Sequence, residues 1–390
     1  MKKAPQKAPQ RAPQKALLAA TAVAAALTLS LAVAPSATAN VTAETATTSW
    51  GPGHGHERGH GHGHGHSRQA VPFTRATVTA AADGSYTLKW DARGERGVRR
   101  VEIRTGGKVV ARGGASGEAV VTGLPAADRQ WFTFDAGRGA TLRLADRQIR
   151  LEGAVNFRDA GGYRTTTGQW VKMGAVYRSD ALDKLTPNDQ AKLQRLGIKT
   201  VYDLRMQDER DKAPDRVPAG ASYVVADVFA GSGSFQTMPR TPEEAVRAMV
   251  DAERAMVSTD GGKKAYAQVF DGVRNEDARA VLFHCTAGKD RTGWANAALL
   301  TALGVPADTV MADYLASNDY RKAANDAILG HLPAQQAAVY KPMLDVRAEY
   351  LDAGYDEVRA KFGSFDRYLA DALGLTPRAL THLKHNLLTD

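Results

Sequence analysis

Residues 278–304 read ARAVLFHCTAGKDRTGWANAALLTALG, a short apolar run followed by a polar turn and a longer apolar segment. The first run has the length of a buried strand, and the segment that ends at Gly304 has the length of a helix. A strand, a tight turn and a helix N-terminus together bind anions, because backbone N–H groups and the helix dipole meet there. The stretch predicts an α/β domain with an anion site at this turn.

The predicted anion site contains Cys285, the single cysteine of the 390-residue chain. Positive charge at the turn stabilises a thiolate, and a thiolate on the floor of an anion site is a nucleophile aimed at phosphorus. Arg291 lies six positions later, across the turn, where its planar guanidinium can bind two phosphoryl oxygens. The spacing therefore predicts phosphate chemistry; a buried cysteine that only fills space is the alternative.

The other residues of the turn support this chemistry. Gly288 lets the backbone approach the ligand, and Gly293 lets the helix pack tightly against the sheet. Thr292 is placed to donate its hydroxyl to the thiolate, and His284 to hold the loop from below. The predicted substrate-binding residues are Thr286, Ala287, Gly288, Lys289, Thr292, Gly293 and, from a separate segment, Arg158.

HCTAGKDRTG (284–293), with its C-x5-R spacing, resembles the signature of the cysteine-dependent tyrosine phosphatases, and its ending resembles their bacterial IphP-type branch of tyrosine/serine and lipid phosphatases. Further segments resemble that branch in the same order: NFRDAGGY (156–163), VYRSDAL (176–182), VYDLR (201–205) and KFGSFDRYLADALGL (361–375). The resemblance covers about 150–390. It implies a cysteine-phosphatase fold, a phosphocysteine intermediate, no cofactor and no metal in the catalytic site.

The resemblance also implies residue roles, with Cys285 and Arg291 joined by Asp290 as general acid and later as activator of water. Asp203 competes for that role, but we favour a structural one, in which it pairs with Lys289 and holds the lysine charge at a phosphate or an inositol phosphate. Arg158 and Arg205 either add positive charge at the rim or tie loops to neighbouring carboxylates.

Strand and helix signals alternate beyond residue 150 and predict a central, largely parallel sheet flanked by helices. Thr186 and Pro187 mark the start of a helix that closes at Gly197, and IKTVYDLR (198–205) reads as a buried strand. The segment 229–257 begins with glycines and continues as an amphipathic helix. It is either a helix packed on the core or a movable lid over the pocket.

Residues 71–148 alternate between apolar and polar side chains in short runs that are separated by glycine-containing turns. Tyr86, Leu88 and Trp90 share one face of such a run. The pattern predicts a small all-β sandwich of about seven strands that resembles an immunoglobulin-like or fibronectin-type module. This module carries no catalytic constellation, so we expect it to bind a ligand or act as a spacer, ahead of a catalytic domain over 149–390.

The N-terminal residues 1–39 have a basic start, an apolar run and the small-residue cleavage site Ala37-Thr38-Ala39, which predicts a signal peptide and a secreted protein. The leader holds five of the nine net positive charges. The remaining net charge of +4 is too small to indicate a nucleic-acid partner. No later stretch is apolar and long enough to span a bilayer. Residues 40–70 include GPGHGHERGHGHGHGH and predict a disordered linker, either a plain spacer or a loose binder of zinc, copper or nickel.

The sequence thus predicts a secreted phosphatase that acts on phosphotyrosine, with phosphoserine and phosphothreonine as further substrates. A phosphoinositide phosphatase is the first alternative. A surface protein that binds metal or cell-wall polymer and carries a vestigial phosphatase domain is the second, although the intact Cys285, Asp290 and Arg291 argue against it.

Overall fold

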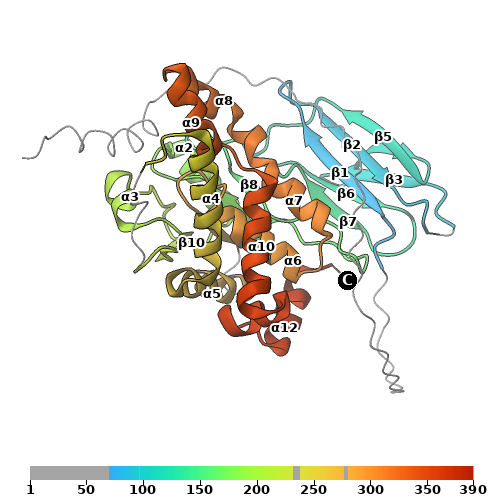
Figure 1. Ribbon diagram of the computed structural model, residues 1–390. Helices are drawn as coiled ribbons and strands as arrows, with labels where there is room; N and C mark the ends of the chain where they lie inside the picture. The colour runs from blue at the N-terminus through green and yellow to red at the C-terminus, as the bar shows by residue number, and fades with distance from the viewer. Residues whose placement is uncertain (1–69, 96, 232–237, 276–279, 390) are drawn as a thin grey trace, which may run out of the picture.

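The computed structural model describes residues 70–95, 97–231, 238–275 and 280–389, which form an all-β module packed against a larger α/β domain (Figure 1). The predicted signal peptide and almost all of the His-rich linker lie outside the described residues. Within the described ranges, no helix has the length and apolar character needed to cross a membrane.

The β module contains two antiparallel sheets, with strand orders β1-β2-β5 and β4-β3-β6-β7. Its strands are β1 (Arg75–Ala80), β2 (Tyr86–Asp91), β3 (Val101–Thr105), β4 (Lys108–Gly113), β5 (Ser116–Val121), β6 (Trp131–Asp135) and β7 (Leu142–Ala145). The inward side chains alternate along each strand, as Leu88 and Trp90 do on β2 and Phe132 and Phe134 do on β6. The predicted all-β sandwich is confirmed.

Trp170 of the α/β domain is buried in the core of the β module, where its indole nitrogen donates to the Phe73 carbonyl oxygen over 3.3 Å. A buried ion pair adds to this contact: Arg129 Nη1 lies 2.6 Å from Asp159 Oδ2. Asp159 belongs to the segment 156–163 singled out above. The module is therefore joined to the α/β domain by shared core packing and a buried charge pair.

The α/β domain is built on a five-stranded sheet in the order β11-β10-β12-β9-β8. Its strands are β8 (Arg158–Asp159), β9 (Val176–Ser179), β10 (Thr200–Asp203), β11 (Ser222–Val225) and β12 (Val281–His284). All neighbouring pairs are parallel except β8 with β9. This confirms the predicted, largely parallel sheet and places β12, which leads into Cys285, at its centre.

Helices cover both faces of this sheet (Figure 1). They are α2 (Pro187–Arg195), α3 (Gln207–Lys212), α4 (Pro242–Ser258), α5 (Asp260–Arg274), α6 (Arg291–Ala302), α7 (Ala307–Leu315), α8 (Ser317–Gly330), α9 (Ala334–Leu344), α10 (Ala348–Phe362), α11 (Phe365–Arg367), the π-helix η3 (Tyr368–Ala372) and α12 (Pro377–Leu387). The Thr186 side chain caps α2 and accepts from the Asp189 amide, as the sequence predicts.

Successive residues of β12 point to opposite sides of the sheet. Val281 and Phe283 join the large core formed with the C-terminal helices, whereas Leu282 joins a smaller core under α2. Because both faces are covered, β12 is buried along its whole length. The strand therefore gives the loop that follows it a rigid base.

Helix α4, which begins within the segment 229–257, packs along α10 on the large core (Figure 1). Met249, Met256 and Val257 are buried there. This matches the interpretation of a core helix, and the alternative of a movable lid stays a prediction.

Candidate active site

Cys285 directly follows β12, and α6 begins at Arg291, so the intervening residues form a loop between the sheet and a helix N-terminus. The first bond of the helix runs from the Trp294 amide to the Asp290 carbonyl. The amides of Arg291, Thr292 and Gly293 precede that bond and are left without an intrahelical partner. The loop and the helix start thus present N–H groups at one place, beside a buried sulfur.

Two glycines shape this loop. Gly288 has φ of 66°, and a Cβ there would lie 2.3 Å from the Ser179 carbonyl oxygen. A Cβ on Gly293 would meet the Tyr314 ring at 2.7 Å. The tight backbone approach expected of both positions is therefore present, and any larger side chain would displace the loop or the first turn of α6.

Arg291 lies across the loop, with Nη2 3.4 Å from Thr286 Oγ1. Its guanidinium is held by Glu209 on α3, with Nη1 2.6 Å from Oε2 and Nη2 2.8 Å from Oε1. Thr286 donates to the same carboxylate. Burial disfavours the charged carboxylate, but Arg291 and Thr286 more than offset it and lower the pKa of Glu209 to about 2. Sequence reasoning missed Glu209, which has no motif around it and lies 82 residues from Arg291.

Lys289 does not pair with Asp203, so that prediction is wrong. The lysine is only 3% exposed. Its Nζ lies 2.7 Å from Asp290 Oδ1 and 3.3 Å from the carbonyl oxygen of Asp345, at the end of α9. The side chain extends toward the end of α9 and away from the end of β10, because the carboxylate of Asp290 and the carbonyl of Asp345 accept its hydrogen bonds.

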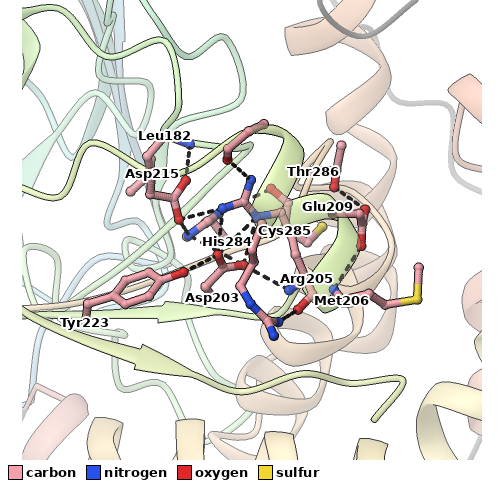
Figure 2. Close-up of polar contacts among 12 residues, drawn as sticks. Leu182, Asp203, Arg205, Met206, Glu209, Asp215, Tyr223, His284, Cys285 and Thr286 are labelled. Atoms are coloured by element: carbon pink, nitrogen blue, oxygen red, sulfur yellow. Dashed lines mark hydrogen bonds and ion pairs between the residues drawn. The ribbon is translucent and has the colours of Figure 1, made fainter. Parts of the chain in front are cut away.

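Asp203 instead belongs to a buried group of charges under the loop, shown in Figure 2 beside Cys285. Arg205 Nη2 lies 2.7 Å from an oxygen of Asp203 and 2.8 Å from an oxygen of Asp215. Tyr223 donates to Asp203 over 2.7 Å. Burial acts against the carboxylate, but His284 and Arg205 outweigh it and hold the pKa of Asp203 below its usual range. Of the two roles considered for Arg205, the structure shows the tie to carboxylates.

His284 is fully buried below the loop, with Nε2 3.0 Å from Asp215 Oδ2 and Nδ1 3.3 Å from the Cys285 carbonyl oxygen. Burial opposes protonation, but Asp215 and Asp203 together raise the pKa of His284. Asp203, Asp215 and His284 offer potential metal-ligand atoms within 4.8 Å of one another. Arg205 bridges both carboxylates and so already supplies positive charge to this group.

Arg158 was predicted to bind substrate, either from the rim or, in the alternative considered, as a tie between loops and carboxylates; the structure shows the tie, with Nε 3.5 Å from Asp313 Oδ1. The side chain is 1% exposed. Its Nη2 donates to the Asp313 carbonyl oxygen and to Ser317 Oγ, both over 3.1 Å. Asp313 also binds Arg178 over 2.8 Å. Arg158 therefore ties the segment 156–163 to α7 and α8 beneath the loop, as the second of its two considered roles required.

Two further groups lie close to the loop. Thr292 Oγ1 is buried and has no hydrogen-bond partner among the described residues, and its predicted donation to the thiolate stays a prediction. Glu253 on α4 is fully buried and accepts from Tyr314 Oη over 3.0 Å. Burial, with a further contribution from Asp290, raises the pKa of Glu253 to about 8. A single buried glutamate in an amphipathic helix gives no sequence signal of this position.

Known proteins match the part of the chain that contains this loop. Residues 149–389 match the family model described as "Tyrosine phosphatase family". A Cupriavidus necator protein that carries the name of a tyrosine-protein phosphatase is 37% identical over 224 residues, which is 56% of this chain and 81% of that protein. The Mycobacterium tuberculosis "Triple specificity protein phosphatase PtpB" is 30% identical over 277 residues, 61% of this chain and 98% of that protein. The crystal structure of P. aeruginosa TpbA covers 44% of this chain and 88% of its own, with 18% identity and a TM-score of 0.22.

Proposed function

Because the chain belongs to the tyrosine phosphatase family, we propose that it hydrolyses phosphotyrosine through a phosphocysteine intermediate on Cys285. The observation that carries the proposal is the loop after β12. Cys285 lies at its base, and the Arg291 guanidinium spans it as far as Thr286. An anion held there meets a sulfur nucleophile, a guanidinium and a helix N-terminus at once.

In the first step, Cys285 Sγ forms a bond to phosphorus while the bond from phosphorus to the leaving phenolate oxygen breaks. Asp290 transfers its proton to that oxygen. In the second step, water attacks phosphorus and gives a proton to Asp290, and the electron pair of the S–P bond returns to sulfur. Asp290 is suited to this work by position, since it directly precedes α6 and Lys289 holds its Oδ1.

Arg291 and the loop amides stabilise the charge that develops on the equatorial phosphoryl oxygens. Glu209 fixes the plane of the guanidinium before the substrate arrives, because it binds both terminal nitrogens. A group that is already oriented loses little freedom in the transition state. Glu209 is thus a positioning residue for Arg291.

The surroundings of Lys289 favour substrates with a single phosphoryl group. The lysine is buried and bound to Asp290 and to the Asp345 carbonyl, so its charge is not presented at the mouth of the loop. A second phosphate, as on a phosphoinositide, gains no cation from this position. We therefore place phosphotyrosine ahead of phosphoinositides. A phosphoserine peptide, which also carries one phosphoryl group, is the necessary comparison.

We further propose that the enzyme acts outside the cell, since residues 1–39 have the pattern of a signal peptide. Detection of the mature protein in the culture medium, beginning at Asn40, would support this. Retention of the uncleaved chain inside the cell would contradict it.

The test of the activity is Cys285→Ser. The variant should bind inorganic phosphate like the wild type, because the amides and Arg291 remain, and should lose turnover of a phosphotyrosine peptide by about 10⁴-fold or more. The wild type should keep full activity in EDTA. Comparable turnover by variant and wild type would refute the phosphocysteine route, and higher kcat/KM on phosphatidylinositol phosphates than on the peptide would refute the substrate preference.

A further inference from the structure

The segments NFRDAGGY (156–163) and VYRSDAL (176–182) have no role in the reaction described so far, yet both lie directly beneath the catalytic loop. Residues of both segments donate hydrogen bonds to the loop carbonyls of Thr286, Ala287 and Gly288. The Ala181 amide donates to the Thr286 carbonyl over 3.2 Å. Both segments therefore bind the same loop through its carbonyl groups.

Asn156 and Arg178 make the closest of these bonds. Asn156 Nδ2 donates to the Ala287 carbonyl over 3.0 Å and to the Gly288 carbonyl over 3.1 Å. Arg178 Nη2 donates to the Gly288 carbonyl over 2.8 Å. Both side chains are fully buried. Two successive loop carbonyls are therefore directed toward the support and away from the phosphate site.

The orientation of the carbonyls fixes that of the amides. In a planar trans peptide unit, the C=O and the N–H point in opposite directions. When the carbonyls of Ala287 and Gly288 point into the support, the N–H groups of Gly288 and Lys289 point to the other side, where the phosphoryl group would lie. No backbone carbonyl of the described residues accepts from these two amides.

Neighbouring groups hold both side chains in place. Asn156 Oδ1 accepts from Arg158 Nη1, so its NH₂ group is the end that faces the loop. Arg178 Nη1 binds Asp313 Oδ2 over 2.8 Å, and Asn296 donates to the same oxygen over 2.7 Å. Burial and the nearby Arg158 lower the pKa of Arg178 to about 10, which leaves its guanidinium charged at neutral pH.

We propose that Asn156 and Arg178 are positioning residues, which turn the loop amides of Gly288 and Lys289 toward the phosphoryl group by holding the opposite carbonyls from below. This inference deepens the proposed function and rests on it. It assigns part of the anion affinity to side chains that never touch the substrate.

Asn156→Asp is the sharpest test. The variant keeps an oxygen for Arg158 but places a second oxygen, in the position of Nδ2, against the two carbonyls, and the repulsion should rotate the peptide units. We expect inorganic phosphate to bind at least about 10-fold more weakly, which corresponds to about 1.4 kcal/mol. We expect kcat/KM on a phosphotyrosine peptide to fall by about 10²-fold, the size of one lost oxyanion donor. Asn156→Ala removes the two hydrogen bonds without adding repulsion. Its phosphate affinity and kcat/KM should lie between those of Asn156→Asp and the wild type.

Asn188→Asp is the matched control, because Asn188 is exposed on α2 and its amide contacts Glu152 rather than the loop. It should behave as the wild type. All proteins are measured by phosphate calorimetry at least 15 °C below their own Tm, so that loss of stability alone does not change the affinity. If Asn156→Asp does not fold, the phosphate affinity of Asn156→Ala is the test of the inference.

Wild-type phosphate affinity in a folded Asn156→Asp or Asn156→Ala variant would overturn the inference, whatever its effect on Tm. The proposed function fails in a different way. If the wild-type protein hydrolyses no phosphomonoester, the activity is refuted, while the phosphate titration still compares the wild type with the variants.

Discussion

Glu209 binds Arg291 through both carboxylate oxygens, at 2.6 and 2.8 Å, and so connects the short helix α3 to the first residue of α6. Thr286 donates to the same carboxylate from the start of the loop. The two ends of the catalytic loop are therefore held together by one side chain that comes from outside it. The guanidinium is therefore already oriented in the free protein, before a substrate binds.

Glu209→Gln should lower kcat/KM on a phosphotyrosine peptide by about 10- to 100-fold, because a misdirected guanidinium loses near-attack geometry. Asp208→Asn on the same helix is the control, since Asp208 is exposed and pairs with Lys212 in an i,i+4 contact. Steady-state kinetics of both variants check the prediction. An unchanged or higher kcat/KM for Glu209→Gln would mean that Glu209 binds Arg291 but does not orient its guanidinium for the reaction.

Glu253→Gln should change how stability depends on pH. Burial raises the pKa of Glu253 to about 8 in the folded protein, from the 4.5 that is usual for a glutamate. The folded state therefore keeps a proton that the unfolded chain releases, and stability is lost as pH rises from about 4.5 toward 8. Glutamine keeps the acceptor for Tyr314 and cannot ionise, so the Tm of the variant should exceed that of the wild type by roughly 2–4 °C or more at pH 8 and match it near pH 4.5.

Thermal unfolding of Glu253→Gln at pH 4.5 and pH 8 measures this difference, with Asp251→Asn as the control from an exposed position of the same helix. The groups that act on Glu253 are Tyr314 from α7 and Asp290, Lys289 and Cys285 from the loop, and none of them is changed by the substitution. A Tm difference that is equal at both pH values would show that Glu253 does not hold an extra proton.

Arg129→Met should destabilise the protein by about 3 kcal/mol, because it leaves the Asp159 carboxylate buried without its cation. Both side chains of this pair are at most 4% exposed. Arg195→Met is the matched control: it breaks an exposed pair with Asp128 and should cost less than about 1 kcal/mol. Urea unfolding of the two variants gives the comparison, and equal losses would indicate that burial of the Arg129–Asp159 pair does not raise the cost of breaking it.

Local sequence predicted the elements of this fold well. Alternating side chains predicted the strands of the β module, the cap at Thr186 predicted α2, and the apolar run before Cys285 predicted β12. These signals act over a few residues, since side-chain periodicity and end capping depend only on neighbours along the chain. The position of Cys285 and Arg291 around one loop followed from the same local information.

Only the tertiary structure decided which charged side chains meet. Lys289 pairs with Asp290 and not with Asp203, and Arg158 lies in the interior and not at the rim. Glu209 and Asn156 contact the loop region from positions 82 and 131 residues away in the sequence. A short motif specifies its own backbone, but the partner of a buried charge depends on which distant elements pack beside it and on the cost of leaving that charge unpaired. The sequence by itself thus determined the loop and the positions of its cysteine and arginine, whereas the packing of distant segments determined which side chains support that loop.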